Sequence, residues 1–169
     1  RRVAPPPARE EGSAWLRGDW PVRWICAPAS AQEPRITLFR LALRCSRAER
    51  VRLHITADER YTLYLDGQLV GRGSQRGSPW RWHYETYDVQ LPPGRHVLLA
   101  RVWSLGSAAP VAQMGVRHGF LLRAEGEHAS RYSTGDAPWM ARRVEGYQFA
   151  GGPLTWGSGH DEVVDGRGL

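Results

Sequence analysis

The sequence contains no lysine and no asparagine, and only two of its 169 residues are cysteines. All 23 basic side chains are therefore arginines. Lysine and asparagine have the most A-rich codons, so a GC-rich genome explains both absences. Cys26 and Cys45 are too few for a disulfide framework, and neither has the CxxC or histidine spacing of a zinc site. These absences exclude a disulfide-stapled scaffold and a zinc module.

Long apolar runs are also missing, and none approaches the roughly 20 residues of a membrane-spanning helix. The first residues, RRVAPPPAREEG, lack the hydrophobic core of a signal peptide. The sequence therefore predicts no membrane partner, and it favours the cytoplasm over secretion without fixing the location. Because the chain does not begin with methionine, we interpret it as a piece of a larger multidomain protein.

The abundant residues are those of turns and short strands. The chain has 19 glycines, 12 prolines and 8 tryptophans, a composition that favours many turns over long helices. Its net charge of +6 would suit a nucleic-acid partner. However, the arginines are spread over the whole chain and interleaved with aspartate and glutamate, which is typical of a solvated surface.

The strongest local signal is a β-hairpin within residues 57–73. Residues 61–65 and 68–72 both read as strands, and Asp66 and Gly67 alone separate them. An Asp-Gly pair accommodates the positive φ angles of a two-residue hairpin turn. The sequence therefore predicts two antiparallel strands joined by a tight turn.

Further strand signals occur along the chain, each an apolar alternation or run next to turn residues. The predicted strands are residues 36–44, 51–57, 84–89, 96–104, 120–125, 129–133 and 139–144. They recur at roughly ten-residue spacing, which is typical of an antiparallel β-sandwich or jelly roll rather than a βαβ sheet. We expect residues 1–14 to form a Pro-rich linker or arm and residues 15–169 to form a single all-β domain, mostly irregular after residue 150.

Six short motifs occur in a fixed order after residue 64. They are Leu-Asp-Gly at 65–67, Val-Gly-x-Gly at 70–73, a Trp/Tyr-rich loop at 80–84, Tyr-Asp at 87–88, a turn with Gly94, and Val-Trp at 102–103. In this order they resemble the N-terminal module of bacterial α-L-rhamnosidases and related large glycoside hydrolases, a galactose-binding-like jelly roll. The resemblance is best over residues 20–125.

The resemblance implies an accessory role. In those enzymes the chemistry resides in a separate (α/α) barrel, where two acidic residues act as general acid and base on the rhamnoside bond. This chain is too short to encode that barrel, so no catalytic residue is carried over and the chain is expected not to be an enzyme by itself. We expect a module that packs on the catalytic domain of the same polypeptide and helps to bind carbohydrate, such as a rhamnose-containing glycan.

The candidate carbohydrate-binding residues lie in the loop after the hairpin and are Trp80, Trp82, Tyr84 and Arg76. Flat aromatic faces stack on the C–H face of a pyranose, and a guanidinium donates hydrogen bonds to hydroxyl groups. The same alternation of aromatic residues is also what a strand that buries one aromatic face would show. On an extended backbone, His83 would point away from these rings.

A second interpretation uses the same loop in another way. The three aromatic side chains could stack on the bases of a single-stranded nucleic acid, while Arg72, Arg76 and Arg81 follow its phosphates. A nucleic-acid partner is the less favoured alternative, because the arginines are not clustered on this loop alone.

No motif predicts catalysis, a metal or a cofactor. Asp58 and Glu59 lie between two predicted strands, where calcium can bind in galactose-binding-like folds, but the surrounding residues show no ligand pattern. The six histidines never have HExxH spacing, and no GxSxG elbow occurs. We therefore expect no cofactor, and scattered surface histidines.

Overall fold

In a computed structural model of the chain, the residues described are 20–27, 34–78, 81–109, 113, 115–150 and 161–168. These residues form β-strands joined by turns and by short 3₁₀ helices at Gly106–Ala108, Ala129–Arg131 and Gly166–Gly168. The strands are β1 (Arg35–Cys45), β2 (Glu49–Asp58), β3 (Arg60–Leu65), β4 (Gln68–Gly73), β5 (Glu85–Leu91), β6 (Gly94–Ser104), β7 (Gly119–Ala124), β8 (Met140–Arg143), β9 (Tyr147–Ala150) and β10 (Asp161–Val164).

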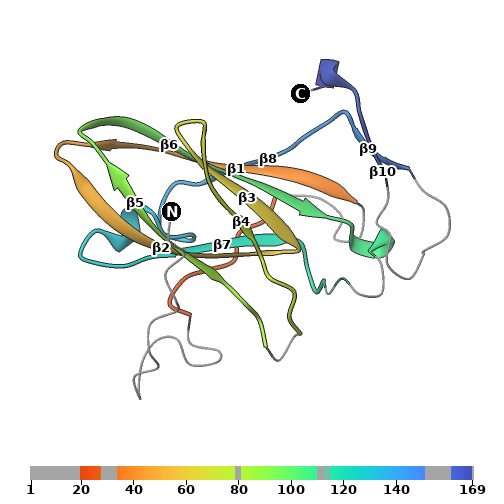
Figure 1. The fold of residues 1–169 in the computed structure, drawn as a ribbon, viewed down its shortest axis with the longest axis horizontal. Coiled ribbons are helices and arrows are strands. Elements are labelled where there is room, and N and C mark those ends of the chain that lie inside the picture. The colour runs from red at the N-terminus through yellow and green to blue at the C-terminus, as the bar shows by residue number, and fades with distance from the viewer. Residues whose placement is uncertain are drawn as a thin grey trace.

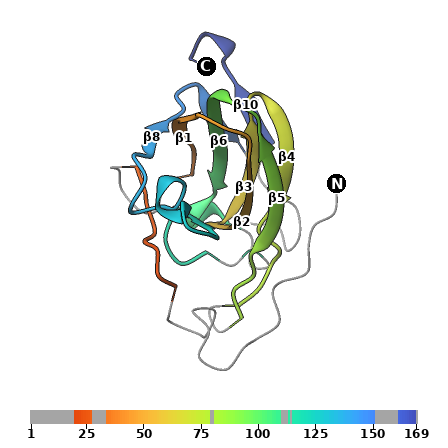
Figure 2. The same ribbon diagram turned by 90° about the vertical axis from the view of Figure 1, so that its left-hand side faces the viewer.

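Two antiparallel sheets face each other in the fold (Figures 1 and 2). One has five strands in the order β4-β3-β6-β1-β8, and the other has three in the order β5-β2-β7. A separate hairpin of β9 and β10 lies beside the larger sheet. The predicted all-β antiparallel sandwich is confirmed.

The core lies between the two sheets, and strand alternation fills it. On β6, for example, Leu98, Ala100 and Val102 are fully buried, whereas their neighbours in sequence are half-exposed. From the smaller sheet, Leu53 and Ile55 of β2 point into the same cluster. Residues of both sheets thus form one continuous hydrophobic core.

The Val-Gly-x-Gly motif on β4 follows from close packing between the sheets. A Cβ atom on Gly71 would collide with the ring of Tyr87, and one on Gly73 would collide with the carboxylate of Glu85. Tyr61 donates a hydrogen bond to that carboxylate over 2.8 Å. Glycine is therefore needed at these positions because side chains of β3 and β5 occupy the space a Cβ would take.

The structure corrects one expectation near the C-terminal end and adds a short strand there. Residues 129–133 were predicted as a strand, but Ala129–Arg131 is a 3₁₀ helix. The hydroxyl groups of Ser133 and Thr134 accept hydrogen bonds from backbone N–H groups of β7, and the backbone N–H of Thr134 donates to Leu122, so this segment covers the edge of the smaller sheet without forming a strand. Residues after 150 were expected to be mostly irregular; within them Asp161–Val164 forms β10 and pairs with β9, and residues 151–160 lie outside the described part of the chain.

The predicted division into an arm of residues 1–14 and a domain of residues 15–169 stays a prediction, because residues 1–19 lie outside the described part of the chain. Within the described residues, no helix is long and apolar enough to cross a membrane.

Candidate functional site

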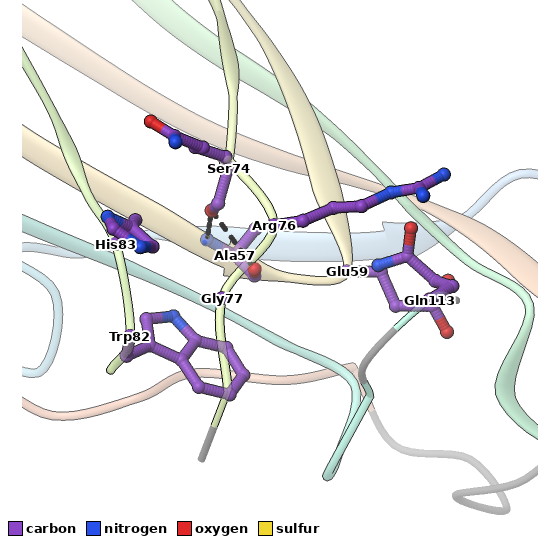
Figure 3. A pocket seen from close by; sticks show the side chains of 9 residues that line it. Ala57, Glu59, Ser74, Arg76, Gly77, Trp82, His83 and Gln113 are labelled. Atoms are coloured by element: carbon purple, nitrogen blue, oxygen red, sulfur yellow. Dashed lines mark hydrogen bonds between the residues drawn. The ribbon is translucent and has the colours of Figure 1, made fainter. Parts of the chain in front are cut away.

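A shallow cleft lies at one end of the sandwich, where the loop after β4 passes the end of β2. The space between its lining residues, open solvent included, is about 270 Å³. Trp82 and His83 lie on one side and Gln113 on the other, with Arg76 extending toward Gln113 (Figure 3). The cleft therefore brings together a large ring, an imidazole, a guanidinium and an amide.

Hydrogen bonds anchor the cleft loop to β2. The indole Nε1 of Trp82 donates to the hydroxyl of Thr56 over 2.8 Å, and this hydroxyl donates to the backbone carbonyl of His83 over 2.8 Å. The hydroxyl of Ser74 accepts a hydrogen bond from the backbone N–H of Ala57, and Figure 3 shows this link. The loop is thus held in place before any ligand binds.

Two of the candidate aromatic residues, Trp82 and Tyr84, are half-buried and packed edge-on against other rings. The ring of Trp82 meets Trp24 at a centroid distance of 5.7 Å and an interplanar angle of 83°. Tyr84 meets Trp20 at 5.1 Å and His54 at 5.6 Å, again edge-on. Trp82 therefore reaches the cleft, whereas Tyr84 serves to pack the loop against its neighbours.

The structure brings together two of the four predicted carbohydrate-binding residues. Arg76 is exposed and lines the cleft with Trp82, but Tyr84 is not among the residues that line it. Trp80 lies outside the described residues. His83 lines the same cleft as Trp82, contrary to the expected extended backbone, because residues 82–84 are not in a strand and β5 begins at Glu85.

Two neighbouring carboxylates are buried beside the cleft. Asp58 accepts hydrogen bonds from the backbone N–H groups of Val116 and Arg117, each over 2.6 Å. Glu59 accepts from the backbone N–H groups at 105 and 106. Burial raises the pKa of both carboxyl groups, and the hydrogen bonds partly oppose this. The pair fastens both ends of the segment from 105 to 117.

Asp58 and Glu59 are the two carboxylates at which a calcium site was considered. Their oxygen atoms already accept hydrogen bonds from backbone N–H groups. No group of three or more histidine, cysteine, aspartate or glutamate side chains in the described residues is placed to hold a metal ion. The expectation that no cofactor is needed remains a prediction.

Sequence reasoning missed Gln113, Thr56 and Trp24. Gln113 reaches the cleft because Arg60 donates to its side-chain oxygen over 2.9 Å, a contact across 53 positions that no local pattern signals. Thr56 lies between the apolar residues Ile55 and Ala57, so strand alternation predicts that its side chain points away from the core. Trp24, which is 46% exposed, carried a signal as an isolated tryptophan before the first strand, but nothing in sequence placed it beside Trp82.

No protein-family model matches the chain, and no curated protein matches it. Among solved structures, it is similar to a GH78 family rhamnosidase of Bacillus sp. GL1, with a TM-score of 0.71 and 28% sequence identity. The alignment covers 89% of this chain and 16% of that chain. The chain is a rhamnosidase-like β-sandwich module.

The rhamnosidase-like module therefore corresponds to a small part of the enzyme it resembles, and the resemblance expected from its motifs is confirmed. A second solved structure, Xyl-CBM35 in complex with a glucuronic acid containing disaccharide, aligns with a TM-score of 0.32 and 17% identity. That alignment covers 68% of this chain and 76% of the other, and it is too weak to bear on fold or function.

Proposed function

We propose that the chain is a non-catalytic accessory module of a rhamnosidase-like glycoside hydrolase, which packs on the catalytic domain of the same polypeptide. The observation that carries this proposal is the unequal coverage of the alignment, 89% of this chain against 16% of the rhamnosidase. Most of the rhamnosidase chain thus has no counterpart here.

The chemistry of the cleft supports a role without catalysis. Glycoside hydrolysis by two carboxyl groups needs an acid and a base on either side of the scissile bond. Glu59 is the one carboxyl group among the lining residues that the structure describes, and backbone N–H groups hold it. A lone, engaged carboxylate favours recognition over bond cleavage.

We further propose that the cleft binds the terminal residue of a glycan. Arg76 and Gln113 are positioned as donors to hydroxyl groups, and the exposed part of Trp82 offers an apolar surface to C–H groups. The cleft is shallow and open to solvent, so a sugar residue would rest against these side chains and would not be enclosed by them.

Two measurements test these proposals. The chain should release no product from an aryl α-L-rhamnoside, whereas the full polypeptide encoded by the same reading frame should. In calorimetric titration, L-rhamnose or a rhamnose-capped oligosaccharide should bind the chain, and Arg76→Ala should weaken binding by about 1–2 kcal/mol through loss of a charged donor. The matched control is Arg47→Ala, at an exposed arginine in the turn after β1.

Turnover by the chain alone would overturn the non-catalytic role. If no sugar binds the chain or the full polypeptide, carbohydrate recognition by the cleft is wrong and the module is structural. A labelled oligonucleotide that binds the chain at low salt would instead favour the nucleic-acid alternative.

A further inference from the structure

The outer face of the five-stranded sheet carries an apolar stripe. It faces away from the sandwich core and consists of half-buried or exposed side chains of β1, β3, β4 and β6, namely Leu38, Ala42, Tyr64, Leu69, Val97 and Leu99. Strand pairing places them side by side, since Tyr64 is opposite both Leu99 and Leu69, and Val97 is opposite Ala42. A soluble sheet face normally presents polar residues here.

Arginines border this stripe at Arg44, Arg95 and Arg142, and Arg40 lies within it, between Leu38 and Ala42 on β1 and opposite Leu99 on β6. In the described part of the chain, no ion pair joins a carboxylate to the exposed side chains of Arg40, Arg44, Arg95 or Arg142. Arg44 and Arg95 are directly opposite each other on β1 and β6. Like charges in opposed positions destabilise a sheet, so this pair is better accommodated beside an anionic surface.

Two acidic side chains near the stripe, Asp66 and Glu162, already have partners within the chain. Asp66 accepts hydrogen bonds from His96 and from the backbone N–H of Val97. Glu162 pairs with Arg101 over 3.4 Å. The face therefore combines apolar side chains with a positive rim, and Arg40 adds a further positive charge among the apolar side chains.

The chain itself covers one end of this face. Phe149 of β9 packs on Trp103 of β6 at a centroid distance of 6.5 Å, and the guanidinium of Arg101 lies 5.2 Å from the ring centroid of Tyr147. Figure 1 shows the β9–β10 hairpin toward one end of the sheet, away from the turns that join β1 to β2 and β5 to β6. The β9–β10 hairpin does not cover the whole outer face. Met140 of β8 lies on this face next to the stripe, opposite Arg40 of β1, and is 57% exposed.

We propose that this stripe, with its arginine rim, is the surface by which the module docks on the catalytic part of the same polypeptide, against an apolar patch bordered by acidic residues. The inference rests on the proposed function, because it takes its partner from there. The alignment covers 16% of the rhamnosidase, so most of that enzyme is available as a partner for a module of this kind.

Charge distinguishes this partner from other occupants. A second copy of the chain would bring two arginine rims together, which opposes association. A nucleic acid would match the rim, but it stacks on aromatic faces, and the centre of the stripe is mostly aliphatic. An acidic protein surface with an apolar centre satisfies both parts of the face.

Hydroxyl-radical footprinting tests the docking surface. The full polypeptide encoded by the reading frame and the isolated chain are oxidised under the same conditions, and modification is measured at Met140 and Tyr64, with Trp24 at the cleft end as the reference. We expect severalfold slower modification of Met140 and Tyr64 in the full polypeptide. Equal rates at both sites, or protection at Trp24 alone, would overturn the proposal.

A charge-reversal variant of the full polypeptide sharpens the test. Arg40→Glu combined with Arg142→Glu should raise the modification rate of Met140 toward that of the isolated chain, because the face would then repel an acidic surface. Arg81→Glu, at an exposed arginine of the cleft loop, is the matched control and should leave the rate unchanged. Protection that persists in the double variant contradicts an acidic partner.

The outcomes separate this inference from the proposed function. If the full polypeptide hydrolyses a rhamnoside while Met140 and Tyr64 stay unprotected, the accessory role stands and the docking surface is wrong. If the reading frame encodes no glycoside hydrolase, the proposed function itself fails. If the isolated chain forms a dimer that protects Met140, a second copy is the occupant and the proposal is wrong.

Discussion

The two ends of the sandwich use the same kinds of side chain with opposite electrostatic results. At the cleft end, Asp58 and His118 are almost fully buried, and burial raises the pKa of the aspartate and lowers that of the histidine to about 4. At the turn end, the bond to Asp66 raises the pKa of His96. Burial alone would raise the pKa of Asp66, but hydrogen bonds from His96 and Val97 outweigh it and lower the pKa.

The two ends of the sandwich are stabilised by different kinds of polar interaction. Both nitrogens of His96 face acceptors, the carboxylate of Asp66 and the backbone carbonyl of Pro92, so the ring must be protonated to satisfy both. His118 instead has Arg35 near it and shares a hydrogen bond with the hydroxyl of Thr37, which favours the neutral ring. The turn end depends on a charged pair near solvent, and the cleft end on buried polar groups.

Loss of the Asp58 carboxylate should have the largest effect. Asp58→Ala leaves the backbone N–H groups of Val116 and Arg117 without their acceptor, and we expect the free energy of unfolding to fall by about 3–4 kcal/mol. Urea unfolding followed by tryptophan fluorescence measures it. Asp136→Ala, at an exposed position, is the control and should change little. Equal effects of the two substitutions would contradict the anchoring role of Asp58.

His118 should make stability depend on pH below neutrality. Its lowered pKa means that the neutral ring contributes stability above pH 6.5, and this contribution is lost as the pH falls through about 4. A shift of this size corresponds to about 3 kcal/mol. His118→Gln removes the titration, so the difference in unfolding free energy between wild type and variant should shrink as the pH falls from 6.5 to 4.

The comparison with the variant is needed because Asp58 and Glu59 act in the opposite direction. Their raised pKa values favour the folded protein at low pH, where both are protonated, and this contribution is lost as the pH rises. Both carboxylates remain in His118→Gln, so subtraction removes them. His128→Gln, at an exposed histidine, should reproduce the wild-type profile.

The turn end should give the smallest effect, with the opposite pH dependence. The raised pKa of His96 means that its contribution is present below pH 6.5 and is lost as the pH rises through the raised value. Because Asp66 is 44% exposed, solvent screening limits the pair to about 0.2–1 kcal/mol. His96→Gln should therefore destabilise the chain at pH 5.5 and have less effect at pH 9 by urea unfolding. A larger effect at pH 9 would contradict the protonated pair.

Much of the fold was predictable because its signals are local. The Asp66-Gly67 turn has positive φ angles at both residues, as its composition requires, and strand alternation located β1 to β7 to within a few residues. The strand predicted at 129–133 was wrong, because Ala129–Arg131 forms a 3₁₀ helix and the segment bonds to β7 mainly through the hydroxyl groups of Ser133 and Thr134. Apolar alternation alone does not distinguish a strand from a segment that caps a sheet edge.

The candidate site was only partly predictable, since its parts lie far apart in the sequence. Arg76 and Trp82 come from one loop and were found together. The expected scatter of histidines on the surface was wrong for His54, His96 and His118, each of which is buried with a polar partner. Those partners come from other strands or turns, and no spacing within the local sequence predicts them.

By itself, the sequence determined the strand periodicity, the hairpin turn and the order of motifs, because each depends on backbone preferences within a few residues. Tertiary structure decided which side chains share an environment. Packing buried Asp58 and His118, left Asp66 near solvent, and assembled a cleft at one end and an apolar stripe on one outer face. The physical reason is that desolvation and strand register depend on contacts between segments, and these exist only once the sheets have paired.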